Sequence, residues 1–134
     1  MAEDVRPRLQ AVLFELRRIP DVLAVAIARR DGLLISHALP KSMDPKRIAA
    51  MAASIVGTSE MASAEMGQGS FLQSIVDCAK SKMLATGAGE EAILITMVRT
   101  DANMGLVLIS VDKAIQTIAA ILEEVAAEPQ EAET

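Results

Sequence analysis

Aromatic side chains are almost absent from this sequence. Its 134 residues contain no tryptophan or tyrosine and only two phenylalanines, Phe14 and Phe71. Proteins that bind nucleic-acid bases or flat cofactor rings commonly stack them on aromatic side chains, so this scarcity argues against both. The net charge of −5 argues the same way, because phosphate backbones are bound by concentrations of lysine and arginine. We therefore expect no nucleic-acid partner and no cofactor.

Cysteine and histidine each occur once, as Cys78 and His37. One cysteine cannot form an internal disulfide, and one residue of each kind cannot make an ordinary Cys/His zinc site. The two could form a nucleophile pair, but they fall on different predicted strands, and we interpret each as an ordinary strand residue. The phosphate-binding pattern GxxxxGK[ST] is also missing. We expect no catalytic residue and no metal ligand, so the chain should not be an enzyme.

The ends of the chain carry most of the recognisably solvated sequence. The opening MAEDVRPR is charged and lacks the apolar core of a secretory signal, which predicts a cytoplasmic protein. The closing EPQEAET has the composition of an acidic tail. Hydrophobic residues make up 51% of the whole. We expect one folded domain over residues 1–127 and a disordered tail over residues 128–134.

A long helix is predicted between Asp44 and Met66. Asp44 can cap the first free backbone amides, Pro45 suits the first helical position, and Gly67 supplies the end. The run IAAMAASIVGTS within it has no charge, so neither side of the helix is suited to water. One stripe has the spacing of a core-facing surface: Ile48, Met51, Ala52, Ile55, Ser59, Ala62 and Met66. The opposite stripe is mainly small: Ala49, Ala50, Ala53, Gly57, Glu60 and Ala64.

Both stripes of this helix need cover, and a chain of this length cannot easily build layers on both sides of it. We expect one stripe to pack on the chain's own sheet and the other to meet a second protein surface, most simply the same helix of a second copy. A buried alanine-rich helix in a compact monomer is the alternative. A membrane span is not expected here, because the uncharged run falls well short of about 20 apolar residues.

Two apolar runs predict strands that are covered on both faces. VLAVAIA, residues 22–28, places large side chains on one face and alanines on the other, which would admit a closely packed helix. AILITMV, residues 92–98, is the second run. Asp31 and Gly32 suit a two-residue hairpin turn before a returning strand at 33–38. Weaker patterns predict two further strands. One covers residues 71–77 and could lie at a sheet edge, and the other covers residues 82–86.

Terminal helices complete the predicted order. The first begins near Asp4, and the last begins after Asp101 or Asn103 as its cap. Gly105 in the first turn of the last helix is costly, and it is reasonable only if the backbone passes close to something, most simply the adjoining strand. The order helix-strand-strand-helix-strand-strand-strand-helix predicts an α+β fold. Its five-stranded antiparallel sheet would carry the long helix on one face and the two terminal helices on the other.

Four segments, in this order, resemble the roadblock/dynein light chain family over about residues 9–121. They are LRRIP at 16–20, VLAVA at 22–26, RDGL at 30–33, and AILITMV at 92–98 followed by NMGL at 103–106. Asp31 and Gly32 match the family's hairpin, and Asn103 and Gly105 match the start of its last helix. The resemblance implies a roadblock fold with profilin-like layering, of the stand-alone MglB-like type found in bacteria and archaea.

The resemblance also implies a dimer in which the long helices and an edge strand of two copies meet. Its partner would be a second copy, forming a homodimer, or a paralogous roadblock protein. The interface residues expected from the long helix and the edge strand are Ala49, Ala50, Ala53, Gly57, Glu60, Ala64, Phe71, Gln73 and Ile75. A small Ras-like GTPase is the further partner that the resemblance implies. The favoured function is a non-catalytic dimeric regulator that stimulates hydrolysis or nucleotide exchange.

Two other functions remain open from the sequence. One is a structural dimeric adaptor of the dynein-light-chain type without nucleotide dependence. The other is a small-molecule sensor with a pocket between sheet and helix. Arg29, Arg30 and Arg99 are candidates for an arginine donated to a GTPase, although solvated strand ends are the favoured role for each. The five methionines at positions 43, 51, 61, 66 and 83 could form an adaptable binding surface, although core filling is the commoner use of methionine.

Overall fold

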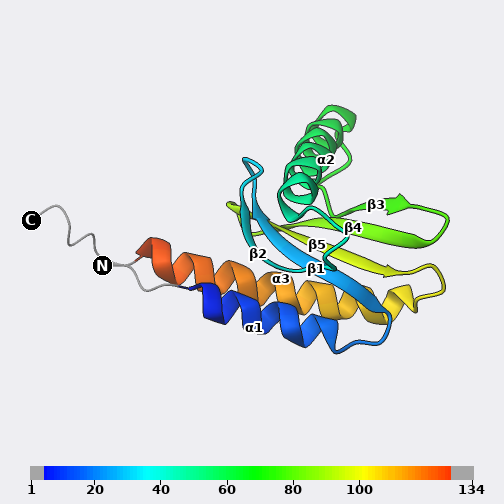
Figure 1. The fold of residues 1–134 in the computed structure, drawn as a ribbon. Coiled ribbons are helices and arrows are strands. Elements are labelled where there is room, and N and C mark those ends of the chain that lie inside the picture. The colour runs from blue at the N-terminus through cyan, green and yellow to red at the C-terminus, as the bar shows by residue number, and fades with distance from the viewer. Residues whose placement is uncertain (1–4, 128–134) are drawn as a thin grey trace, which may run out of the picture.

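The structure, a computed structural model, describes residues 5–127 and places one five-stranded sheet between helices. The elements in chain order are α1 (Arg6–Arg17), β1 (Val22–Arg29), β2 (Leu34–Ala38), α2 (Pro45–Met66), β3 (Ser74–Asp77), β4 (Ser81–Ala88), β5 (Ala92–Arg99) and α3 (Met104–Ala127). The strand order is β2-β1-β5-β4-β3, and every neighbouring pair is antiparallel. Helices α1 and α3 lie side by side on one face, and α2 stands on the other (Figure 1). The predicted fold is confirmed, whereas the expected acidic tail lies outside the described residues.

The two central strands divide their side chains between two cores. Val25 and Ile27 of β1 face α1 and α3, while Ala26 and Ala28 face α2. Leu23 departs from this pattern because β1 has an irregular register against β5 between Val22 and Ala24, and Leu23 is 39% exposed. The predicted alanine face is therefore the one on which α2 packs, since small side chains allow close approach.

Short side chains fix the starts of the two long helices. Oδ1 of Asp44 accepts hydrogen bonds from the backbone amides of Lys46 and Arg47, at 3.0 and 3.4 Å. Gly67 ends α2 with a φ of 63°. Oδ1 of Asn103 accepts from the amide of Leu106 at 3.2 Å, so Asn103 is the cap of α3. The predicted start and end of α2 are confirmed, and of the two caps that the sequence left open for α3 the structure has Asn103 rather than Asp101.

Several local details differ from the expectations. The first hairpin loop has three residues, because the amide of Arg29 bonds the carbonyl of Leu33 and Gly32 takes a φ of 94° after a turn. The explanation offered for Gly105 is wrong: a Cβ there would meet only the Asn103 side chain, at 3.5 Å. Strand β3 is shorter than predicted and β4 is longer, since pairing with β5 extends β4 to Ala88. Helix α1 begins at Arg6 rather than near Asp4, which lies outside the described residues.

Helix α3 is the most apolar of the three. Within the described part of the chain, Met104–Ala126 is the one helix that could cross a membrane by length and composition. Core helices of soluble proteins meet the same criterion, so the observation is weak evidence of a span. Here Val107, Val111 and Ile118 are buried in the core between helix and sheet.

Candidate functional site

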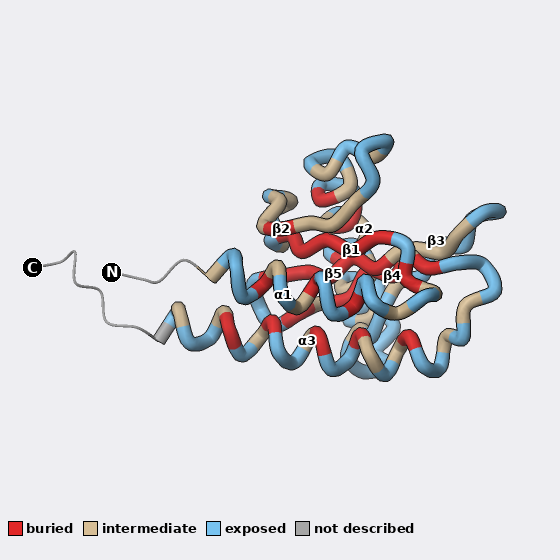
Figure 2. Tube along the Cα trace, turned by 60° about the horizontal axis from the view of Figure 1, so that its bottom comes forward, coloured by how far each residue is buried: buried red, intermediate tan, exposed pale blue. Residues whose placement is uncertain are grey.

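Helix α2 is covered by its own chain along only half of its length. Its three buried residues, Ala49, Ala52 and Val56, contact alanines and isoleucines of the central strands. Beyond Val56 no residue of α2 is buried, and this distal half, residues 57–66, rises away from the sheet (Figure 2). A helix without charged residues in its middle is therefore open to solvent over its far end and over the side turned from the sheet.

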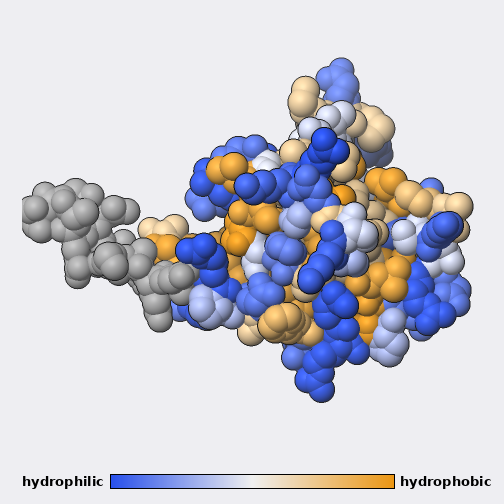
Figure 3. Space-filling view, in the orientation of Figure 1, coloured by the Kyte–Doolittle hydropathy of each residue, from blue (hydrophilic) through white to orange (hydrophobic). Residues whose placement is uncertain are grey.

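The uncovered side of α2 is apolar and smooth. Met51 is 53% exposed and Met61 is 74% exposed. Between them Gly57 leaves open space, since a Cβ there would meet nothing within 4 Å. Tan and orange atoms gather over α2 and over neighbouring β3 in the space-filling view (Figure 3). Of the eleven exposed large hydrophobic side chains among the described residues, six lie on α2 or on and just before β3. A gathering of exposed apolar side chains is typical of an interaction site.

Strand β3 continues this surface along the edge of the sheet. It pairs with β4 on one side and is the last strand of the sheet on the other. Ile75 is 46% exposed, Val76 is 38% exposed, and Leu72, just before the strand, is 79% exposed. We call the combined region the α2–β3 surface: Ala50, Met51, Gly57, Met61, Leu72, Ile75 and Val76. Of the two exposed strand residues, Val76 pairs with Met83 and lies on the α2 face of the sheet, whereas Ile75 pairs with Leu84 and lies on the face of α1 and α3. An open edge with apolar side chains can pair with a strand from another chain.

The structure divides the nine residues expected at the interface. Five are exposed on α2 or near β3: Ala50, Gly57, Ala64, Gln73 and Ile75. Two are partly covered by the core beneath α2, namely Ala53 and Phe71. Ala49 is fully buried on its own sheet, so its expected exposure on the small-residue stripe is wrong. Glu60 is half-buried in an ion pair with Arg30.

The helix is thus rotated about its axis relative to the two expected stripes. Met51 and Met66 were expected to face the core, and both are exposed. Ala49 takes the core position instead, because the alanines of β1 leave room for a close approach of the helix backbone. Met61, Leu72 and Val76 are surface residues that the interface prediction omitted. The apolar character of Met61 on a helix lacking a polar face was the available signal.

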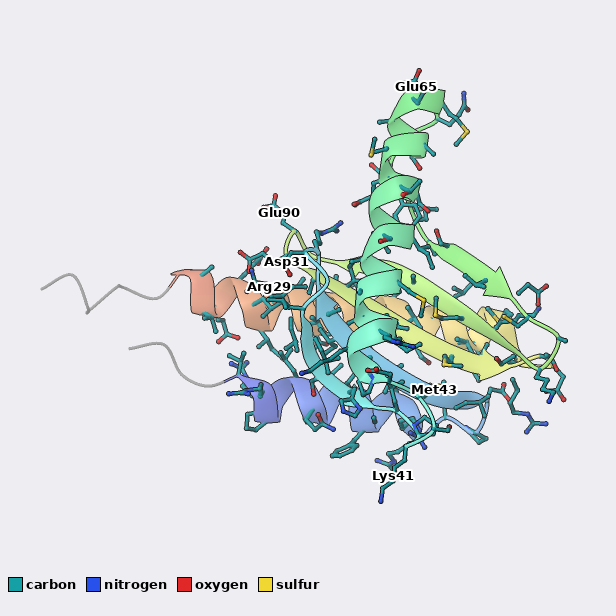
Figure 4. The ribbon with its side chains drawn as sticks, turned by 45° about the horizontal axis from the view of Figure 1, so that its top comes forward. Arg29, Asp31, Lys41, Met43, Glu65 and Glu90 are labelled. Atoms are coloured by element: carbon teal, nitrogen blue, oxygen red, sulfur yellow. The ribbon has the colours of Figure 1, made fainter. Side chains whose placement is uncertain are left out.

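The three candidate arginines are each held by a carboxylate. Arg29 pairs with Asp31 at 2.8 Å, and the Arg99 Nε lies 3.1 Å from Asp101. Arg30 pairs with Glu60 at 2.6 Å and is the most covered of the three, with 30% of its side chain exposed. In Figure 4 Arg29 and Asp31 lie at the β1–β2 turn, and Glu65 stands at the far tip of α2. None of these arginines extends freely toward a partner in this arrangement.

The residues considered for chemistry are dispersed. His37 lies on β2 and Cys78 follows β3, so the two belong to opposite edges of the sheet and cannot form a nucleophile pair. Among the described residues no group of three His, Cys, Asp or Glu side chains could hold a metal ion.

An open groove of about 450 Å³ lies between α1 and α3. It is lined by Ala11, Val12, Glu15, Leu16, Ile19, Ser110, Lys113, Ala114 and Thr117. The sensor hypothesis placed its pocket between sheet and helix, whereas this groove runs between two helices.

Sequence comparison identifies a known domain. The sequence pattern of the Roadblock/LC7 domain matches residues 8–98. The uncharacterized protein MJ1340 of Methanocaldococcus jannaschii is 32% identical over 113 residues, covering 84% of this chain and 98% of that protein.

Comparison of structures gives the same fold. MglB of Myxococcus xanthus superposes with a TM-score of 0.87 at 22% identity, covering 97% of this chain and 98% of that one. The gliding protein MglB of Thermus thermophilus superposes with a TM-score of 0.81 at 21% identity, covering 92% and 95% of the two chains.

Proposed function

The chain belongs to the Roadblock/LC7 domain family, and we propose that it is a non-catalytic dimeric regulator of a small Ras-like GTPase. The observation that carries the proposal is the α2–β3 surface, which is apolar and left uncovered by the described chain. The MglB-like fold and the family resemblance of the sequence support a GTPase as the regulated partner.

A second copy of the chain fits the α2–β3 surface best. In a dimer with two-fold symmetry, the α2–β3 surface of one copy would contact the same surface of the other. The apolar α2 helices would then meet, and the two β3 edges would pair. Gly57 would allow the two helix backbones to approach closely, because no side chain separates them there.

The charges at the ends of α2 support an arrangement in which the α2 helices of the two copies are antiparallel. Lys46 and Arg47 lie at the start of the helix, and Glu65 lies near its end at the far tip (Figure 4). In an antiparallel pair of α2 helices centred near Gly57, the basic start of one copy faces the acidic end of the other. A parallel pair would place like charges together. An antiparallel pair would therefore place opposite charges near each other at both ends of the contact, although Asp44 offsets part of the charge at the helix start by pairing with Arg47 at 3.8 Å.

The regulated step is tested with a small Ras-like GTPase from the same organism. GTP hydrolysis and nucleotide release are measured with and without this protein, using a large excess of the regulator. We expect one of the two rates to change at least about tenfold, a shift of roughly 1.4 kcal/mol in a barrier. The absence of any change in either rate, together with no binding, would remove GTPase regulation.

A dimeric adaptor is the alternative, and the pairing of all three candidate arginines favours a scaffold over an arginine donor. The two functions differ in their dependence on nucleotide. Capture of the GTPase by immobilised protein is compared in the GTP, GDP and nucleotide-free states. A regulator discriminates among these states, whereas an adaptor retains its target equally in all three.

A further inference from the structure

Two hydrogen bonds between side chains join the distal half of α2 to other parts of the described chain. The hydroxyls of Ser59 and Ser74 lie 2.7 Å apart, which ties the helix to the start of β3. On the other flank, Nη1 of Arg30 donates to Oε1 of Glu60 at 2.6 Å. No residue beyond Val56 is buried, so no fully buried side chain helps to hold this half of the helix on the sheet.

Arg30 lies in the β1–β2 turn and is itself held by the β4–β5 turn. Its Nη2 donates to the carbonyl of Gly89 at 3.0 Å, and its backbone amide donates to the carbonyl of Glu91 at 3.0 Å. The guanidinium lies where a side chain at position 87 would be, since a Cβ on Gly87 would come within 2.6 Å of Nη2. The β1–β2 turn, the β4–β5 turn and α2 therefore meet at one side chain.

We propose that Arg30 is a positioning residue that sets the direction in which the distal half of α2 leaves the sheet. The inference deepens the proposed function, because this direction determines how the α2–β3 surface is presented to a second copy. From Val56 to Met66 the helix extends by about 15 Å, so a tilt of about 10° at Val56 displaces its tip by roughly 2–3 Å. A shift of that size is enough to separate side chains that must interlock at a helix contact.

Arg30 is suited to this role because it pairs with Glu60 of α2 in a partly shielded place. The Arg30 and Glu60 side chains are 30% and 41% exposed, so the pair is partly shielded from solvent. A short charge-assisted hydrogen bond in such a place is stronger and more directional than a pair of exposed charges. Arg29 supplies the matched control, because it lies in the same turn and pairs with Asp31 rather than with α2.

The test combines Arg30→Met, Glu60→Gln and the double variant, with Arg29→Met as the control. Backbone amide exchange is followed by mass spectrometry in full-length protein carrying Met61→Glu, which keeps the dimer contact out of the measurement. The dimer dissociation constant is measured separately without Met61→Glu. We expect exchange at residues 57–66 to accelerate about tenfold and the dissociation constant to rise about tenfold. The double variant should be no worse than Arg30→Met alone, and Arg29→Met should change neither quantity.

A purely structural role predicts a different result, in which exchange accelerates equally at residues 48–56 and in β5 and the dissociation constant follows global stability. That outcome would overturn the inference, as would unchanged exchange at residues 57–66. The test also remains separate from the proposed function. If the natural chain is monomeric, regulation by a dimer fails while the exchange at residues 57–66 still decides the role of Arg30.

Discussion

The two edges of the sheet are finished in different ways. At the β2 edge, α1 supplies polar side chains: Ser36 donates to Gln10, whose amide donates to the carbonyl of His37 at 3.2 Å. Arg17 donates to the carbonyl of Ala38 at 2.8 Å. The Ser36 hydroxyl and the carbonyls of His37 and Ala38 thus have partners on α1.

At the β3 edge the described chain shows one comparable contact, between the hydroxyls of Ser74 and Ser59 at the start of the strand. Its sequence is SIVD, and it lacks the lysine or proline that commonly prevents exposed edges from pairing with other chains. Val76 is exposed on the α2 face of this edge, and Ile75 is exposed on the opposite face. The β2 edge is therefore covered by α1, whereas the β3 edge is exposed and, in the proposed dimer, would pair with a second copy. Changes at the first should therefore alter stability, and changes at the second should alter association.

The largest effect on association is expected from Met61→Glu. Met61 is 74% exposed, so a carboxylate is harmless in the monomer but would be buried without a partner in the dimer. The dimer dissociation constant should rise at least about 100-fold, roughly 2.7 kcal/mol, while the free energy of unfolding of the monomer changes by less than about 0.5 kcal/mol. Sedimentation velocity over a concentration series measures the constant. Phe14→Glu is the control, since Phe14 is 56% exposed on α1, and an equal loss of dimer there would place the interface elsewhere.

Opening the β2 edge should act on stability instead. Gln10→Ala removes the hydrogen-bond partner of Ser36 and of the His37 carbonyl, both part-buried bonds. We expect the free energy of unfolding to fall by about 2 kcal/mol. The dimer dissociation constant should not change after it is corrected for the fraction of molecules that are unfolded. Urea unfolding measures the loss. Gln116→Ala should be nearly neutral, because Gln116 bonds only Asp112 on the exposed side of α3. A dimer that is weakened by Gln10→Ala after that correction would remove the distinction between the edges.

Gly57→Ala should move stability and association in opposite directions. A methyl group has open space at this position in the monomer, and alanine favours a helix over glycine by about 1 kcal/mol. The monomeric Met61→Glu protein should therefore gain about that much on adding Gly57→Ala. In the dimer the same methyl should separate the helices and weaken association several-fold. A gain in both quantities would show that no backbone approaches Gly57.

The smallest effect is expected in the core between the two edges. The Thr96 hydroxyl is buried and has no hydrogen-bond partner among the described residues. Thr96→Val should raise the free energy of unfolding by about 0.5–1 kcal/mol, because it removes an unsatisfied polar group at nearly constant volume. Thermal unfolding measures the gain. The dimer dissociation constant should not change, and a change would mean that global stability alone controls association.

The sequence was sufficient where a structural choice is local. The caps at Asp44 and Asn103 and the alanine face of β1 each depend on neighbouring residues, and these predictions are confirmed. The rotation of α2 was not local, because both of its stripes are apolar and periodicity cannot choose between them. It is decided by the fit of Ala49 against alanines of β1, which requires the packed sheet.

The Arg30–Glu60 ion pair could not be predicted from the sequence either. Its members are 30 residues apart and meet only because the β1–β2 turn and α2 converge over the sheet. Each arginine was expected to be solvated at a strand end. The role of Arg30 depends instead on the space above Gly87, which cannot be inferred from sequence spacing.

Amide exchange as a function of protein concentration tests most directly whether a second copy completes the α2–β3 surface. The full-length chain is labelled at concentrations well above and well below the dissociation constant, and exchange is compared in residues 57–66 and 74–77. We predict that amide exchange in both segments slows as the protein concentration rises. Exchange in β2, which α1 covers in the monomer, should have the same rate at every concentration. Exchange of residues 57–66 and 74–77 that stays equally fast at every concentration would contradict the account.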